Sequence, residues 1–300
     1  MRVFVTGASG HIASAVIPEL IGAGHQVVGL ARSDDSAEAV AALGAEVRRG
    51  DLDDLEGLAE AAAGSDGVIH LAFKHEAMLS GDYQSAVASD LAATQAIGAA
   101  LAGRQAPFVN TGGTLSLSSI TGRPGTEKDV VAGGPRTDAT SATIALADSG
   151  VRSSVVRLPP LVHSDLDHTG FAPTLIGLAR EKGHAAYIGD GANRWPAVHT
   201  LDAALLYRLA VESAPAGSYL HPVGDEGIPF RQIAETIGSR LGVPAISVTA
   251  EEAPEHLSFL AGFAHLDNPT SSALTRELLG WEPTHPGLIA DLGEGHYFGQ

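Results

Sequence analysis

Residues 6–13 read Thr-Gly-Ala-Ser-Gly-His-Ile-Ala and lie between an apolar segment and a segment with helical periodicity. Gly7 permits a tight turn, Gly10 lets the backbone approach a ligand, and Ala13 is small enough for close helix packing. The following helix directs free N–H groups and the positive end of its dipole toward an anion. This pattern predicts a site for the pyrophosphate of a dinucleotide, formed by Gly7, Ser9, Gly10, His11 and Ile12.

The residues after the next apolar segment, 26–30, bear on the choice between NAD and NADP. Ala31 stands where an NAD site commonly has an acidic residue, and Arg32 and Ser33 follow it. A guanidinium pairs with a 2′-phosphate through charge-assisted hydrogen bonds, and a serine hydroxyl adds another. The pattern favours NADP, with NAD as the alternative. Asp34 and Asp35 would oppose the phosphate if they faced it, and Arg32 as a solvated surface residue is the competing interpretation.

Three further segments are expected to contact the dinucleotide. The Asp51 carboxylate and the Leu52 amide can bind the edge of adenine, although Asp51 could instead cap the next helix. The segment Leu71-Ala72-Phe73 follows the fourth apolar segment, and its small residue lets the backbone pass close to the cofactor. Pro159, after the apolar segment 153–158, completes the predicted set.

Short apolar segments alternate with helical patterns through the first half of the chain. Four to six apolar residues between helices are typical of parallel strands covered on both faces. We therefore predict an α/β fold, a doubly wound parallel sheet of the Rossmann type over residues 1–160. Residues 161–300 are expected to form a smaller, mostly helical cap that binds the substrate, with a strand near 218–221 returning to the main sheet.

Composition excludes several classes of protein. The 300 residues are 44% hydrophobic and 18% charged, as in a globular enzyme. A net charge of −17 would repel a nucleic-acid backbone. The chain has no cysteine, and we find neither a signal peptide nor a membrane-spanning run, so a cytoplasmic protein is expected. We assign no metal site, because the His/Asp cluster at 163–168 lacks zinc-ligand spacing and better fits a lid.

Five segments together resemble the extended and atypical short-chain dehydrogenase/reductases, often described as NAD-dependent epimerase/dehydratases. They are residues 6–13, Gly50-Asp51-Leu52, His70-Leu-Ala-Phe73, Val156-Arg-Leu-Pro-Pro160 and Trp195-Pro-Ala-Val-His-Thr-Leu-Asp-Ala-Ala204. The resemblance covers essentially the whole chain. It implies a bound dinucleotide and a small-molecule substrate.

The chain departs from this family where its catalytic residues are expected. The family has a tyrosine and, four positions later, a lysine on the helix that precedes the strand ending in Arg157. Here residues 134–145 contain neither. Gly112 and Gly113 stand where serines are frequent, and position 90 is Asp where the family often has Asn.

Other groups must then stabilise the alkoxide that hydride transfer creates, since the nicotinamide supplies the reactive centre. Our order of preference begins with three residues: Thr114, Thr111 and Lys74. His75, His163 and Tyr187 follow. For the two threonines, hydrogen bonding to the local backbone is the competing interpretation, and for the others, solvation in a loop.

We therefore expect an NADP(H)-preferring oxidoreductase acting on the carbonyl or alcohol of a small, neutral or apolar molecule. The alternatives are an epimerase or dehydratase that retains its NAD(P), and a non-enzymatic NAD(P)-binding sensor. A homodimer is suggested by the family and permitted by an apolar stripe on the helix 83–101, unless that stripe covers the sheet. The stripe comprises Val87, Leu91, Thr94, Ile97 and Leu101.

Overall fold

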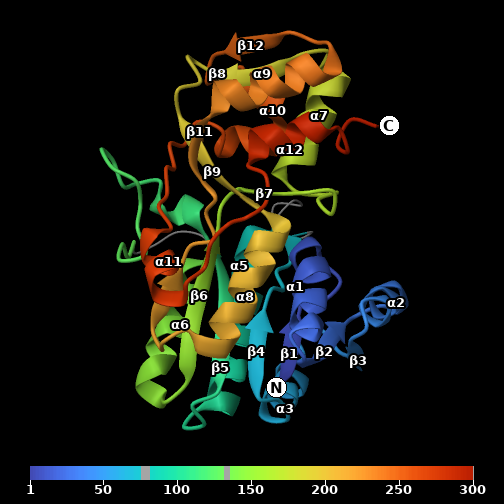
Figure 1. The fold of residues 1–300 in the computed structure, drawn as a ribbon, viewed down its shortest axis with the longest axis vertical. Helices are drawn as coiled ribbons and strands as arrows, with labels where there is room; N and C mark the ends of the chain where they lie inside the picture. The colour runs from blue at the N-terminus through green and yellow to red at the C-terminus, as the bar shows by residue number, and fades with distance from the viewer. Residues whose placement is uncertain (76–81, 132–135, 300) are drawn as a thin grey trace.

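The computed structural model describes residues 1–75, 82–131 and 136–299. They form an α/β body with a smaller cap above the carboxyl ends of its strands (Figure 1). No helix in these ranges is long and apolar enough to cross a bilayer.

The body is built on a seven-stranded parallel sheet in the order β10-β6-β5-β4-β1-β2-β3, which confirms the predicted doubly wound fold. β1 has β2 on one side and β4 on the other, so the chain reverses direction across the sheet beside β1 and leaves a crevice there. The strands are β1 (Arg2–Thr6), β2 (Gln26–Ala31), β3 (Glu46–Arg49), β4 (Gly67–His70), β5 (Pro107–Gly113), β6 (Arg152–Leu158) and β10 (Ser218–Leu220).

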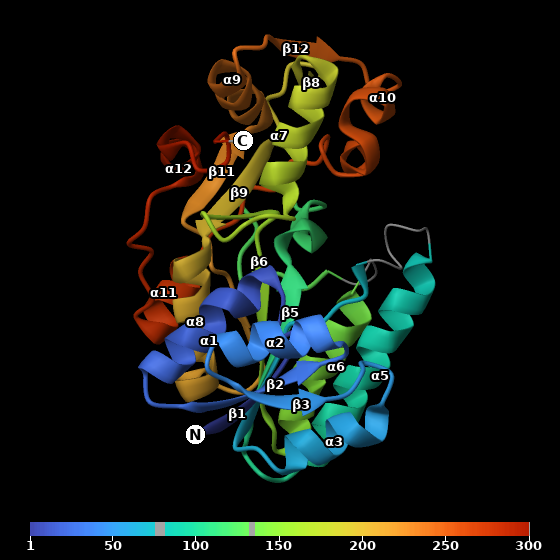
Figure 2. The same cartoon turned by 90° about the vertical axis from the view of Figure 1, so that its right-hand side faces the viewer.

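Helices cover both faces of the sheet (Figure 2). Side chains alternate along β1, so Val3 and Val5 pack with one layer and Phe4 with the other. The first layer contains α1 (His11–Gly22) and α8 (Thr200–Ser213), and the second contains α3 (Leu55–Ala63), α5 (Tyr83–Leu101) and α6 (Thr137–Ala145). Both faces are thus buried, as the near-continuous apolar strands predicted.

The apolar stripe of α5 is only partly turned into the protein. Thr94, Ile97 and Leu101 are fully buried within this one chain and cover the sheet. Val87 and Leu91 are half-buried, and the homodimer remains a prediction.

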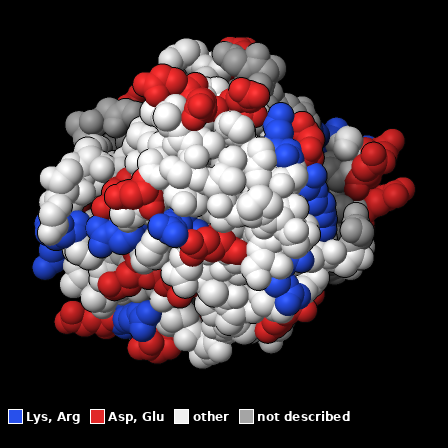
Figure 3. All heavy atoms as spheres, turned by 90° about the horizontal axis from the view of Figure 1, so that it is seen from above, with Lys and Arg blue, Asp and Glu red and all other residues white. Residues whose placement is uncertain are grey.

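The cap combines helices with two small sheets, more strand than the sequence indicated. One sheet has the order β11-β9-β7 and the other pairs β12 with β8. These strands are β7 (Leu161–His163), β8 (Ala185–Ile188), β9 (Arg194–His199), β11 (Asp225–Pro229) and β12 (Ala245–Val248). The helices are α7 (Phe171–Lys182), α9 (Phe230–Leu241), α10 (Ala253–Leu257) and α12 (Leu288–Glu294). From above, charged side chains surround a broad uncharged area (Figure 3).

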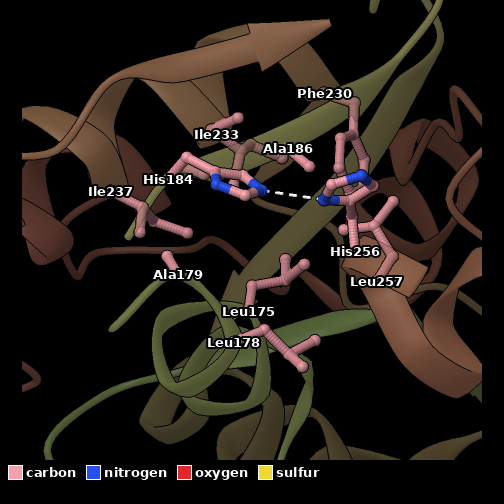
Figure 4. Close-up of a pocket in the computed structure, with 12 residues that line it drawn as sticks. Leu175, Leu178, Ala179, His184, Ala186, Phe230, Ile233, Ile237, His256 and Leu257 are labelled. Atoms are coloured by element: carbon pink, nitrogen blue, oxygen red, sulfur yellow. Dashed lines mark hydrogen bonds between the residues drawn. The ribbon is translucent and has the colours of Figure 1, made fainter. Parts of the chain in front are cut away.

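An apolar core of its own holds the cap together. Side chains from α7, β8, α9 and α10 converge there, and Figure 4 shows His184 and His256 facing each other at its edge. Their ring nitrogens are 2.8 Å apart.

The C-terminal half also contributes to the body. Its helix α11 (Ala273–Leu279) lies in the body, as does α2 (Asp34–Ala42) of the N-terminal half, and Trp281 follows α11. The Trp281 side chain is fully buried in the core of the α1 and α8 layer, and its indole N–H donates to the Asp202 carbonyl at 2.8 Å. Residues far apart in the sequence therefore share one core.

Replacing Trp281 with alanine should lower the free energy of unfolding by about 3–5 kcal/mol, because a large buried side chain leaves a cavity. Chemical denaturation followed by circular dichroism measures this change. Leu278→Ala is the control, because Leu278 lies on α11 and is 47% exposed. An equal effect of the two substitutions would contradict the assignment of Trp281 to the core.

Candidate active site

The turn between β1 and α1 brings two stretches of backbone together. Gly7 has a φ of +64°, and an added Cβ would lie 2.7 Å from the backbone nitrogen of Ala72. The Gly10 amide donates to the Gly7 carbonyl at 3.0 Å. Gly10 is also the N-cap of α1 and has no side chain to bind the first amides of the helix. These amides are available to an anion.

A cleft of about 1380 Å³ lies between the body and the cap, at the carboxyl ends of the strands. Residues from several separate segments of the sequence line this cleft together. Of the predicted cofactor contacts, the lining includes Gly7, Ser9, Gly10, His11, Ile12, Arg32, Asp51, Leu52, Leu71, Ala72, Phe73 and Pro159.

Ser33, also a predicted cofactor contact, is not among the residues that line the cleft, and its hydroxyl is bonded within a helix cap. It is the N-cap of α2, where its hydroxyl accepts a hydrogen bond from the Ser36 amide at 3.2 Å. Ser36 lines the cleft. The predicted contact of Ser33 with a phosphate would therefore compete with a helix cap.

Asp34, the first acidic residue after β2, has a cationic partner outside the predicted phosphate site. Asp34 forms an ion pair with Arg49, which also donates to the Ser33 carbonyl. The Asp34 side chain is 88% exposed, whereas Arg32 lines the cleft. The objection that Asp34 would repel a phosphate is weakened, since a cation already neutralises it.

The two threonines after β5 differ in their surroundings. Thr111 lines the cleft, where its hydroxyl donates to the His70 carbonyl at 2.8 Å and lies 2.9 Å from the Tyr207 hydroxyl. Thr114 is fully buried, and its hydroxyl donates to the Asn268 side chain at 2.8 Å. Asn268 donates in return to the Thr114 carbonyl. Thr114 thus fastens the cap to β5, and Thr111 is the more accessible candidate.

The remaining predicted donors separate into two groups. Lys74 and His75 line the cleft, and the Lys74 ammonium is paired with Asp53 at 2.5 Å. His163 is fully buried and 2.8 Å from Asp291. Tyr187 packs in the core of the cap.

Asp90 forms the centre of a buried chain of hydrogen bonds. Its carboxylate accepts from Arg136 Nε at 3.2 Å and lies 3.1 Å from His70 Nε2. His70 Nδ1 is 2.6 Å from the Thr6 hydroxyl, and the Arg136 guanidinium lies 4.3 Å from the centre of the Phe73 ring. Burial acts to raise the pKa of Asp90, but Arg136 and His70 lower that pKa below its usual range.

Arg157 is a second buried guanidinium on the cleft wall. It is 5% exposed, donates to the Asp129 carbonyl at 3.0 Å, and lies 3.5 Å from the ring centre of Tyr219. Burial lowers the pKa of Arg157. Tyr219 also lines the cleft.

The cap covers this end of the cleft with aromatic side chains. Phe171 stacks on Phe263, with ring centres 6.1 Å apart, and meets Phe259 edge-on at the same distance. All three line the cleft. An apolar ligand would bury surface against this wall.

Two titratable groups lie beside the glycine turn. His11 Nδ1 is 3.6 Å from Asp167 Oδ1. Burial, with His168 and His163 nearby, lowers the pKa of His11 to about 4. Burial raises the pKa of Asp167 to about 6. His11 is therefore neutral at pH 7, whereas Asp167 is ionised.

Several residues that line the cleft were not selected by sequence reasoning: Arg136, Tyr219, Tyr83, Phe171, Phe259 and Phe263. Arg136 carried one usable signal, because it stands at the start of the helix from which the tyrosine and lysine are missing. The aromatic residues carried none, since single phenylalanines on helices are normally core residues.

The family model for the NAD dependent epimerase/dehydratase family matches residues 3–220. A Schizosaccharomyces pombe protein described as uncharacterized is 48% identical over 300 residues, covering 99% of this chain and all of that protein. An uncharacterized Saccharomyces cerevisiae protein is 43% identical, covering 97% of this chain and 98% of its own length.

A third relative has a name that describes a reaction. It is the 4-hydroxy-2-methyl-3-oxo-4-farnesyl-3,4-dihydroquinoline-1-oxide ketoreductase of Stigmatella aurantiaca, 29% identical over 86% of this chain and 79% of that protein. Among solved structures, the Streptomyces venezuelae dTDP-glucose 4,6-dehydratase DesIV, with NAD bound, superposes with a TM-score of 0.78 at 19% identity. The match covers 99% of this chain and 98% of that one, and it bears on the fold. With its glycine turn, its parallel sheet and this family match, the chain belongs to the NAD-dependent epimerase/dehydratase family of extended short-chain dehydrogenase/reductases.

Proposed function

We propose that this protein is an NADP(H)-preferring oxidoreductase that transfers a hydride to or from a small, apolar carbonyl compound. The observation that carries the proposal is the single cleft, which runs from the glycine turn past Arg32 to the aromatic wall of the cap. Its volume of about 1380 Å³ exceeds that of a site for one small ligand. It therefore has room for a dinucleotide and a substrate together.

The residues present fit a dinucleotide at each point where its charge must be bound. The amides at the start of α1 suit the pyrophosphate, and the Arg32 guanidinium suits a 2′-phosphate. Asp34, the first acidic residue after Arg32, is paired with Arg49. When bound, the cofactor supplies the hydride, and the protein supplies position and charge.

Basic residues of the C-terminal half are largely committed to other partners, which argues against a sugar nucleotide as substrate. A second pyrophosphate would need a basic clamp beyond the first. Four arginines of this half pair with carboxylates, and a fifth donates to a carbonyl: Arg194, Arg208, Arg231, Arg276 and Arg180. Together with the phenylalanine wall, this favours a neutral or apolar carbonyl compound. The ketone substrate of the Stigmatella relative belongs to the same chemical class.

Within this function, Thr111 and Lys74 are the proposed polar contacts for the substrate, since both line the cleft. Thr114 retains only an indirect role, through its bonds to Asn268. An epimerase or dehydratase would also need acid and base groups on α6. The cleft-facing residues of α6 are Thr137, Thr140 and Ser141, which titrate poorly.

The direct test measures NADPH and NADH oxidation by the purified protein against ketones, aldehydes and conjugated carbonyl compounds, with cofactor binding titrated in the same samples. Turnover with a preference for NADPH is expected. Tight cofactor binding without turnover of any compound would overturn the reductase and favour a sensor.

Arg32→Glu should reverse the cofactor preference, because a carboxylate repels a 2′-phosphate and accepts hydrogen bonds from ribose hydroxyls. We expect the ratio of kcat/KM for NADPH to that for NADH to fall by about 100-fold. The control is Arg49→Gln, a neighbouring arginine engaged with Asp34 and Ser33. A preference unchanged in Arg32→Glu would contradict the role of Arg32.

Cofactor affinity should depend on the ionisation of Asp167. Below pH 6 its carboxyl is neutral, and above pH 6 the negative charge opposes a pyrophosphate beside His11. His11, with a pKa of about 4, adds no compensating charge in this range. We expect the affinity for NADH to fall by about 3- to 10-fold from pH 5 to pH 7.

NADH is the right ligand for this titration because it lacks the 2′-phosphate, whose own second pKa is about 6. Asp167→Asn keeps an oxygen to accept from the Gly170 amide, a bond of 2.8 Å, and should flatten the pH dependence. The same slope in wild type and Asp167→Asn would assign the effect to another group.

A further inference from the structure

Two departures from the family pattern meet in space. Asp90 occupies a position where the family often has Asn, and Arg136 precedes the helix that lacks the tyrosine and the lysine. Arg136 Nε donates to Asp90 Oδ2 at 3.2 Å. The buried Asp90 and the arginine on the cleft wall therefore form one unit.

The conformation and surroundings of Arg136 are energetically unfavourable. Its φ of +62° lies in the left-handed region, which side chains other than glycine rarely adopt. Within the part of the chain that the structure describes, its Nη2 is buried and meets no hydrogen-bond partner. Strained backbone and unsatisfied buried donors both destabilise a fold and are concentrated at functional sites.

The guanidinium is also fixed in direction. Asp90 binds its Nε, and the Phe73 ring lies under its plane at 4.3 Å. Asp90 itself is oriented by His70, which is anchored by Thr6. The Arg136 side chain is still 19% exposed. A cation fixed in this way places its positive charge on the cleft wall without reorganisation.

We propose that Arg136, positioned by Asp90, is the residue that binds the oxyanion formed during hydride transfer, in place of the missing tyrosine and lysine. This inference rests on the oxidoreductase function proposed above. A guanidinium donates hydrogen bonds but does not release its proton in proteins. Arg136 therefore stabilises the oxyanion by charge, and the proton comes from water.

Because Arg136 supplies charge and water supplies the proton, one class of substrate is favoured. A hydride adds to the β-carbon of a conjugated carbonyl compound, the C=C electron pair shifts, and the carbonyl π pair moves onto the oxygen. The resulting enolate is bound by Arg136, and the α-carbon then takes a proton from water. An enolate is a weaker base than the alkoxide of an isolated ketone, so it needs charge stabilisation more than an acid. Enones and quinones are thus the expected substrates.

Binding of a stable enolate tests this role without turnover. Dimedone, a cyclic β-diketone that is largely enolate at neutral pH, is compared with neutral cyclohexanone by calorimetry, with and without NADP. Wild-type protein should bind dimedone at least about 10-fold tighter than cyclohexanone, as expected for a hydrogen bond to a charged group. Asp90→Asn/Arg136→Gln, which removes both charges of the pair, should lose this difference.

Two further variants keep the test decisive if the double variant fails to fold. Arg136→Lys keeps a cation beside Asp90 but lacks the planar fork, so it should weaken dimedone binding by about 10-fold. Arg276→Gln, at an arginine paired with Glu282 outside the cleft, should bind dimedone as wild type does. The ratio of kcat/KM for cyclohexenone to that for cyclohexanone should fall in parallel with dimedone binding.

Undiminished dimedone binding in Arg136→Lys and in the double variant would overturn the proposal. Failure of both NADP and NAD to bind would instead overturn the oxidoreductase function, and the dimedone comparison without cofactor would still decide the role of Arg136.

Discussion

The buried carboxylate of Asp90 constrains the whole cleft. It is 1% exposed, and an ionised group at such a depth is stable only when it is hydrogen-bonded and paired. Its partners come from the end of β4 and from the residue before α6, and Thr6 at the end of β1 completes the chain. Four elements must therefore keep their relative positions for this one charge to remain satisfied.

Basic residues are also unevenly distributed over the molecule as a whole. The chain is strongly acidic, yet Arg32, Lys74, Arg136 and Arg157 line the cleft. Many other basic residues pair with carboxylates on the surface, where each pair adds little stability. Asp51 and Asp53 also line the cleft, so its four cations leave an excess of positive charge where an anionic cofactor would bind, within a negatively charged surface.

Prediction from the sequence succeeded where local periodicity decides the structure. Buried parallel strands are apolar on both faces, so β1, β2 and β4 were recognisable as short apolar segments. Gly7 was recognisable from its place between an apolar segment and a helical one, and its positive φ and its contact with Ala72 explain why glycine is required there. Strands β7, β9 and β11 of the cap escaped prediction because they are short, and each buries a face that only its partners define.

The sequence by itself determined the alternation of strand and helix, the glycine turn, and the absence of a tyrosine and lysine pair from residues 134–145. Only the tertiary structure decided how separate residues act together. It buried Thr114 against Asn268 and joined Asp90 to Arg136. The reason is physical: hydrogen bonds and ion pairs depend on distances of about 3 Å between atoms. Such distances between residues 46 positions apart are set by packing, which no local pattern encodes.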